Sequence, residues 1–293
     1  MEVPILAQIQ WFPGHMAKAR RQVEEKLSII DIVFVLLDAR IPKASENPML
    51  FEIIKDKPIL YILNKSDLAD EYELKRWLLY YKTQGINAVA VNSLTGDSSK
   101  VIVPVAKKIL APLFAKEAKK GMRPRPFRAM VVGIPNVGKS AFINRLAKRP
   151  AAQTGDKPGV TKAQKYIRVD EDLELLDNPG ILWPKFEDPE VGLKLALVGS
   201  IKDDIMPIDD IALYGLKYLS VNYPGQVEAR YSISPIDTSN LVDTFDQIGV
   251  KRGALLPGKL VDYDRVIKLF LHDFRHQKFG RICLEKVPTN VSI

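Results

Sequence analysis

The sequence predicts an α/β domain with a mostly parallel sheet, followed by a small all-helical domain. Through residue 184, short runs rich in Val, Ile and Leu alternate with helical patterns, as strands and helices do in parallel sheets. From about residue 185 the patterns are helical and are separated by turn clusters such as NYPG and LLPG. We therefore expect an α/β domain with an N-terminal helical extension over 1–184, and a helical domain over 185–293.

Four apolar runs, bounded by polar residues or proline, are expected to form buried parallel strands. They span 31–39, 58–63, 86–93 and 127–134. Helical patterns lie between them at 71–84, where Asp70 is a candidate N-cap, and at 99–120. The segment 162–180 is expected to form two further strands joined by a turn at 170–172.

A glycine-rich segment, GIPNVGKS, runs from Gly133 to Ser140 and fits the P-loop pattern. It follows an expected strand and opens a helical pattern, so backbone N–H groups can surround phosphate oxygens. Lys139 would neutralise the β- and γ-phosphates, and Ser140 would hold Mg²⁺. The expected phosphate-binding residues are Asn136, Val137, Gly138, Lys139, Ser140 and Ala141.

Two later segments have the features of loops that sense a γ-phosphate. DNPG (177–180) follows an expected strand. Asp177 can reach Mg²⁺ through water there, and the N–H of Gly180 can meet the γ-phosphate. Upstream, TGDKPGVTK (154–162) supplies Thr161 as a second hydroxyl for Mg²⁺. Either segment alone is an ordinary loop, but their position after the P-loop favours the switch interpretation.

A guanine-reading segment is expected before the P-loop, because NKSD (64–67) ends the second apolar run. The Asp67 carboxylate can accept hydrogen bonds from guanine N1–H and the 2-amino group, whereas adenine offers neither in that pattern. Asn64 would tie this loop to the P-loop, and the Lys65 stem can cover one face of the base. After the next run, the segment Asn92–Ser93–Leu94 can offer a backbone N–H to guanine O6.

The order of these motifs is base loop, P-loop and then switches, so the nucleotide fold is circularly permuted. The carboxyl ends of parallel strands gather at one edge of a sheet, and the same site can therefore be assembled from either order. We predict a circularly permuted P-loop GTPase domain that binds GTP.

Together with the N-terminal QWFPGHMAKAR and with DARIP (38–42), these motifs resemble those of the circularly permuted GTPases of ribosome assembly. The resemblance extends over essentially the whole chain. It implies GTP hydrolysis stimulated by the ribosomal particle, in an assembly factor for the large (50S) subunit. It also implies that the 50S precursor and its rRNA are partners, with the helical domain contacting the RNA.

Hydrolysis needs a group that orients water, and many GTPases place a Gln after DxxG for this. The chain has Ile181 there, so we expect slow hydrolysis alone and completion of the site by another group. The resemblance points to His15 of FPGHM, since an imidazole can orient or deprotonate water; simple packing of His15 is the alternative. The expected catalytic residues are His15, Lys139, Thr161 and Gly180.

Asn136 offers a second aid to hydrolysis. It occupies the P-loop position where the potassium-activated GTPases, which this chain also resembles, carry an Asn that helps to bind K⁺. A monovalent cation there would supply charge that an arginine finger provides elsewhere. Asn also suits a tight turn, and both interpretations stay open.

Composition favours a cytoplasmic protein that contacts no membrane, and we also expect the chain to be a monomer. No apolar run approaches the ~18 residues of a membrane span, and the N-terminus has the reverse order of a secretory signal. The single cysteine, Cys283, excludes an internal disulfide and suits a reducing compartment.

The formal net charge of +8 raises the chance of a polyanionic partner. Two clusters hold much of it, namely Lys107, Lys108, Lys116, Lys119, Lys120, Arg123, Arg125 and Arg128, and then Arg265, Lys268, Arg275, Lys278 and Arg281. In the second cluster, helical spacing predicts that Arg265, Lys268, Arg275 and Lys278 face solvent. A solvated helix face and a phosphate-contacting surface both fit these patterns.

Three other functions remain open. The chain can be a GTPase switch that has no RNA role and acts on a protein partner. Under the ribosome-assembly hypothesis it should capture rRNA and large-subunit proteins, and under the switch hypothesis it should not. A small-molecule kinase would use the P-loop on a metabolite and tolerate ATP, and Asp67 argues against it. A scaffold would bind the nucleotide without turnover.

Overall fold

The computed structural model describes residues 21, 23–54, 57–95, 98–150, 165–177, 186, 188–201 and 207–288. These residues form two compact units. The first, the α/β unit, holds the described residues up to 177 and also those from Glu285 to Pro288. The second, the helical unit, holds the described residues from Phe186 to Leu284.

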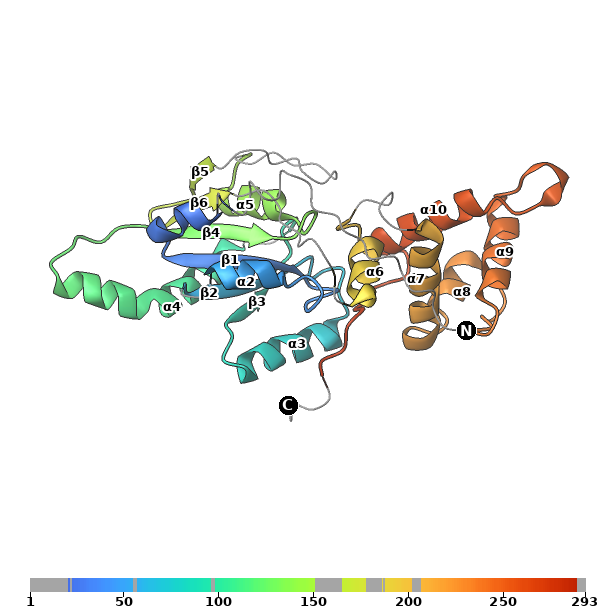
Figure 1. Ribbon diagram of the computed structural model, residues 1–293, viewed down its shortest axis with the longest axis horizontal. Helices are drawn as coiled ribbons and strands as arrows, with labels where there is room; N and C mark the ends of the chain where they lie inside the picture. The colour runs from blue at the N-terminus through green and yellow to red at the C-terminus, as the bar shows by residue number, and fades with distance from the viewer. Residues whose placement is uncertain are drawn as a thin grey trace. The chain divides into compact units, whose positions relative to one another are not determined.

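A six-stranded sheet forms the centre of the α/β unit (Figure 1). Its strands are β1 (Ile32–Asp38), β2 (Ile59–Asn64), β3 (Ala88–Ala90), β4 (Phe127–Gly133), β5 (Lys165–Arg168) and β6 (Leu173–Asp177). Their order is β3-β2-β1-β4-β6-β5, and every neighbouring pair is parallel except β5 and β6. The predicted mostly parallel sheet is confirmed.

The burial of each strand follows from its place in this order. β1 lies between β2 and β4, and all seven of its residues are buried, as its nearly continuous apolar run predicts. β3 lies at the edge, where pairing is available on one side only, and it is limited to Ala88–Ala90. The apolar run over 86–93 therefore predicts a longer strand than the one that forms.

Helices of the α/β unit connect and cover the strands. They are the short 3₁₀ turn η1 (Leu27–Ile29) and the helices α2 (Pro48–Ile54), α3 (Glu71–Thr83), α4 (Ser99–Lys119) and α5 (Lys139–Ala147). α5 packs against β4 and β6, and α3 packs against β3. Asp70 caps α3 as expected, because its carboxylate accepts a hydrogen bond from the N–H of Glu73 at 3.0 Å.

The strand register brings the carboxyl ends of four strands to one edge of the sheet. Asp38 of β1 lies opposite Asn64 of β2, and Leu36 lies opposite Gly133 of β4. Asp177 of β6 pairs in turn with Val131. The described loops that follow β1, β2 and β4 therefore leave the sheet at the same edge, although they are far apart in the sequence.

The helical unit contains α6 (Pro189–Leu197), α7 (Ile208–Asn222), α8 (Gln226–Tyr231), α9 (Leu241–Arg252), the 3₁₀ turn η2 (Pro257–Lys259) and α10 (Tyr263–Arg275). α7 packs against α6, α8, α9 and α10 around a core that includes Leu197, Leu216 and Phe270. In either unit, the helices among the described residues are too short or too polar to span a bilayer.

Candidate functional site

The base loop and the P-loop are in direct contact, and Asn64 makes the first link. Its Nδ2 donates a hydrogen bond to the carbonyl oxygen of Val137 at 2.8 Å, so Asn64 ties the two loops together as the sequence predicts. The other end of the same amide reaches the third loop, where Asn64 Oδ1 accepts from Ser93 Oγ at 2.6 Å and from Ser93 N at 3.3 Å. One buried side chain thus holds three loops.

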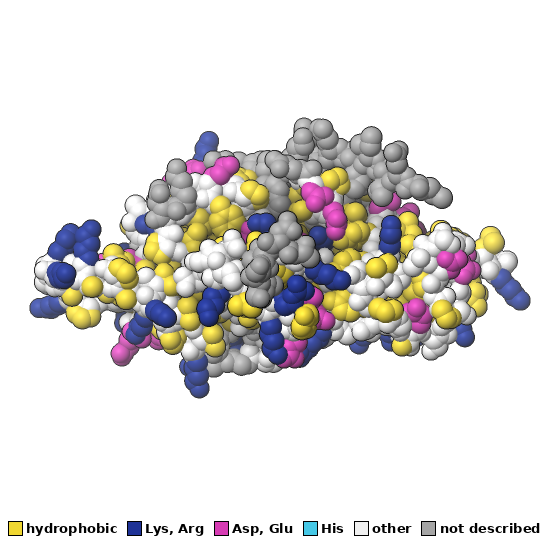
Figure 2. Space-filling model, turned by 90° about the horizontal axis from the view of Figure 1, so that it is seen from below, with side chains coloured by type: hydrophobic (Ala, Val, Ile, Leu, Met, Phe, Trp, Pro, Cys, Tyr) yellow, Lys and Arg dark blue, Asp and Glu magenta, His cyan; other side chains and the backbone are white. Residues whose placement is uncertain are grey.

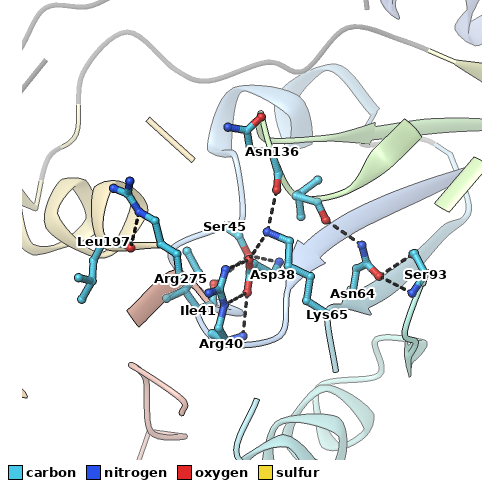
Figure 3. A network of polar contacts seen from close by, with 11 residues as sticks. Asp38, Arg40, Ile41, Ser45, Asn64, Lys65, Ser93, Asn136, Leu197 and Arg275 are labelled. Atoms are coloured by element: carbon cyan, nitrogen blue, oxygen red, sulfur yellow. Dashed lines mark hydrogen bonds and ion pairs between the residues drawn. The ribbon is translucent and has the colours of Figure 1, made fainter. Parts of the chain in front are cut away.

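Lys65 makes the second link, shown in Figure 3. Its Nζ donates to the carbonyl oxygen of Asn136 in the P-loop at 2.7 Å and lies 3.0 Å from Asp38 Oδ2 at the end of β1. Asp38 also holds Arg40, whose Nε and Nη2 donate to the two carboxylate oxygens at 2.9 and 2.7 Å. The cations of Arg40 and Lys65 therefore share one buried carboxylate.

The electrostatics of this cluster favour an ionised Asp38. The side chain is fully buried, and burial alone raises the pKa of a carboxyl group. The charges of Arg40 and Lys65 and the hydrogen bonds from Arg40 outweigh that effect, so the pKa of Asp38 lies well below its usual range. Burial lowers the pKa of Lys65, and the adjacent Asp38 opposes the shift.

The P-loop has the geometry of a phosphate cradle. Gly138 precedes α5 with a φ of 95°, and a Cβ there would collide with Asn64 Nδ2, so this position requires glycine. Lys139 Nζ lies within the loop, where it donates to the carbonyls of Ile134 at 3.2 Å and Gly133 at 3.4 Å. Ser140 and Ala141 follow in the first turn of α5. The backbone N–H groups of a first helical turn have no partner within the helix and can bind a phosphate at the P-loop.

The expected base-contacting residues lie in turns at the ends of β2 and β3. Asp67 is half-buried in a turn that is fixed to β3 by the hydrogen bond from Ser66 N to the carbonyl oxygen of Val91 at 3.1 Å. The N–H of Leu94 donates to Asn92 Oδ1 at 2.8 Å. The Asn92 side chain therefore shapes the third loop from within.

Four predicted residues belong to segments outside the described residues, namely His15, Thr161, Gly180 and Ile181. The described part of Asp177 is its backbone, which ends β6 next to β4 and the P-loop. The structure therefore brings together the base loop, the P-loop and the start of DNPG, and the roles of these residues stay predictions.

Sequence reasoning gave no role to Asp38 or to Ser45. Ser45 Oγ accepts a hydrogen bond from Asp38 N at 3.1 Å and donates to the carbonyl oxygen of Ile41 at 2.8 Å. A carboxylate that ends a fully apolar strand, directly beside the strand that carries NKSD, was the available signal. Such a buried charge needs partners, and Arg40 and Lys65 were the nearest candidates in the sequence.

Comparison with known proteins identifies the family. A family model described as "50S ribosome-binding GTPase" matches residues 128–215. The protein named ribosome biogenesis GTPase A of Priestia megaterium (strain DSM 319 / IMG 1521) is 54% identical over 273 residues, which cover 93% of this chain and 94% of that relative. This chain belongs to the ribosome biogenesis GTPase A family.

Solved structures agree with this assignment. A crystal structure of GNP-bound YlqF from T. maritima has a TM-score of 0.62 and 27% identity, over 92% of this chain and 98% of that one. The GDP-bound YlqF structure from the same source has a TM-score of 0.63 and 26% identity, over 91% and 99% of the two chains. The chain is therefore a GTPase with GTP as its substrate.

The buried Asp38 generates a prediction about stability and pH. Because its pKa is depressed in the folded protein, its stabilising effect is present above the ordinary carboxyl pKa of about 4 and is lost as the pH falls toward the folded pKa. Asp38→Asn leaves the buried Arg40 and the part-buried Lys65 without their anion, and we expect it to lower the free energy of unfolding at pH 7 by about 3–5 kcal/mol.

Urea unfolding of both proteins checks this, and the gap between them should narrow below a pH of about 4. The matched control is Asp172→Asn, which removes a half-exposed carboxylate that pairs with Lys107; it should change stability by less than about 1 kcal/mol. A gap for Asp38→Asn that is the same at pH 7 and pH 3 would contradict the assignment.

Proposed function

We propose that this chain is a GTP-hydrolysing assembly factor for the large (50S) ribosomal subunit, with hydrolysis stimulated by the ribosomal particle. The observation that carries the GTPase part is the contact of the base loop with the P-loop, through Asn64 to Val137 and Lys65 to Asn136. The ribosomal part is supported by the names of the relative and of the matching family model. We expect it to act as a monomer in the cytoplasm, where ribosomes assemble.

At the phosphates, the proposed roles follow from the chemistry of the groups. Backbone N–H groups of the P-loop and the start of α5 surround the β- and γ-phosphates, while Lys139 offsets their charge. Ser140, Thr161 and, through water, Asp177 would hold Mg²⁺. This set fits the ion, because hydroxyl and carboxylate oxygens are hard ligands of the kind that Mg²⁺ prefers, and Ser140 lies in the first turn of α5. The bound ion supplies charge that stabilises the transferring phosphoryl group.

At the base, Asp67 is proposed to select guanine, with the Asn92–Ser93 loop beside it. The structure supports this because Asn64, in the base loop, donates to Val137 of the P-loop and accepts two hydrogen bonds from Ser93 of the third loop. A phosphate bound at the P-loop therefore places the base near Asp67. ATP lacks the two donors that this carboxylate would accept.

The water-orienting group is proposed to be His15, since Ile181 cannot serve. K⁺ at Asn136 is a further proposal. Asn136 has a φ of 55°, a left-handed conformation that itself favours Asn, so its backbone gives a reason for the residue that is independent of K⁺.

RNA binding is proposed for the exposed cations of the first basic cluster that lie on α4 or directly after it. Arg125 pairs with Asp31 and Glu117, Arg128 pairs with Glu174, and Lys107 pairs with Asp172. Five cations remain exposed, and among the described residues they form no ion pair: Lys108, Lys116, Lys119, Lys120 and Arg123. Figure 2 shows dark blue side chains gathered at the left of the view, the side on which Figure 1 places the end of α4.

The second basic cluster also needs correction. Arg275 was expected to face solvent, but its Nη2 donates to the carbonyl of Ala196 at 2.8 Å and its Nε donates to that of Leu197 at 3.2 Å. It therefore satisfies the carbonyls at the end of α6. Arg265, Lys268 and Lys278 are exposed as predicted and stay available for phosphates.

GTP and ATP hydrolysis, measured with and without purified large ribosomal subunits, tests the proposal. We expect hydrolysis of GTP but not ATP, and faster turnover with the particle.

Two further measurements test the water-orienting group and the cation. His15→Ala should lower the particle-stimulated rate by about 10²–10⁴-fold, because the imidazole is proposed to act on the attacking water. The wild-type rate should be higher in K⁺ than in Na⁺. Unstimulated turnover would favour the switch on a protein partner; equal stimulation of His15→Ala, or equal rates in the two salts, would refute those two proposals.

Replacement of Asp67 by Asn tests the selection of the base. Asn presents a donor where Asp accepts, so Asp67→Asn should weaken GTP binding by about 10–100-fold and improve the binding of xanthosine triphosphate, which carries a carbonyl in place of the 2-amino group. Equilibrium titration with both nucleotides measures the change. Asp70→Asn is the matched control, because Asn caps α3 as well as Asp does; it should bind as the wild type does. GTP affinity unchanged in Asp67→Asn would exclude this role.

The double variant Lys116→Gln and Lys119→Gln tests the α4 surface. Each lost phosphate contact should weaken RNA binding and reduce the slope of log affinity against log salt by about 1. Lys75→Gln with Lys82→Gln, on α3, is the control of equal charge. Filter binding of ribosomal RNA over a salt series measures both slopes, and equal slopes for the two double variants would rule out this surface.

A further inference from the structure

The chain ends its course through the helical unit by returning to the α/β unit. We call Glu285–Pro288 the return segment; in Figure 1 it is the dark red segment without helix or strand beside α3. Glu285 and Val287 are buried, and Trp77 Nε1 of α3 donates to the carbonyl oxygen of Glu285 at 3.1 Å. The return segment is thus a packed part of the α/β unit.

The Glu285 carboxylate holds one specific loop. Its Oε2 accepts from the backbone N–H of Lys43 at 2.6 Å, and its Oε1 accepts from that of Ala44 at 3.0 Å. Two consecutive N–H groups that converge on one anion form a stable arrangement. Without Glu285, both donors would need other partners.

This loop is the one that fixes Asp38. Ser45 follows Ala44 directly, and its hydroxyl accepts from the N–H of Asp38 at 3.1 Å. Asp38 in turn lies 3.0 Å from the ammonium of Lys65, which donates to the P-loop carbonyl of Asn136. A continuous series of polar contacts therefore leads from Glu285 to the nucleotide site.

The other side of the return segment is anchored in the helical unit. The hydroxyls of Tyr218 and Tyr223, on and just after α7, bind the backbone of Cys283: Tyr218 donates to its carbonyl and Tyr223 accepts from its N–H, each at 2.8 Å. Leu284 alone separates this anchor from Glu285. Since a residue spans at most about 3.6 Å, a displacement of Cys283 acts directly on Glu285.

We propose that Glu285 is a positioning residue of the nucleotide site, which couples the end of the helical unit to the Lys65 contact with the P-loop. The inference rests on guanine nucleotide binding and not on the ribosomal partner. Release of Glu285 loosens the 41–46 loop, and with it Asp38 and Lys65, so nucleotide dissociates faster. A ligand that moves the end of the helical unit then changes nucleotide affinity, and by linkage the nucleotide changes the affinity for that ligand by the same factor.

Dissociation of a fluorescent GDP analogue, chased with excess GDP, tests this on the full chain without ribosomes. We expect Glu285→Ala to release the nucleotide about five- to tenfold faster. Glu285→Gln keeps an acceptor oxygen and should fall between this variant and the wild type. Lys286→Ala, which changes an exposed neighbour in the same segment, is the matched control and should match the wild type.

The route through Asp38 is tested by a double-mutant cycle. If the effect passes through Asp38, Glu285→Ala should add little to Asp38→Asn, because linked sites are not additive. Full additivity, or wild-type release from Glu285→Ala, would overturn the proposal. Thermal melts check that each variant folds. If Glu285→Ala does not fold, two other variants replace it: Glu285→Gln, and Trp77→Phe, which removes the donor to the Glu285 carbonyl. Release at the wild-type rate from both of these variants would overturn the proposal. Failure of particle stimulation leaves all these measurements unaffected.

Discussion

The buried carboxylate of Asp38 is the constraint on which the arrangement of the nucleotide site depends. Two cations, Arg40 and Lys65, lie against it at the end of β1, and a low dielectric makes each attraction strong but also makes an unpaired charge costly. Lys65 can bind the P-loop carbonyl of Asn136 only because its own charge is offset nearby. The base loop and the P-loop are therefore held in one geometry by a buried charge at the end of β1.

Circular permutation changes the connections of the fold and leaves its geometry intact. A parallel sheet brings strand ends together by register, whatever the order in which the chain visits the strands. Here β1 and β2 come before β4, and their ends still meet it at Asp38, Asn64 and Gly133. Asn64 links these segments, which are distant in the sequence, by hydrogen bonds to Val137 and Ser93. The reordered motifs thus keep the contacts that join the base loop to the P-loop.

Local patterns predicted most of this fold, because apolar periodicity, glycines and caps act over short distances. The P-loop, the Asp70 cap and the Asn64 tie belong to this class. Contacts between distant residues were missed or misjudged. Arg125 and Arg275 were counted as surface charge, yet Asp31 and the α6 carbonyls bind them. The return of Glu285 to Lys43 had no local sign at all.

The hydrogen bonds of Tyr218 and Tyr223 to the backbone of Cys283 have a chemical consequence. Cys283 is the single cysteine of the chain and is almost fully buried. A thiol in such a place reacts with a modifying reagent only when the surrounding structure opens. Its modification rate in the unaltered protein therefore reports how often the last part of the helical unit detaches, and nucleotides or ribosomal particles that steady this region should slow the labelling.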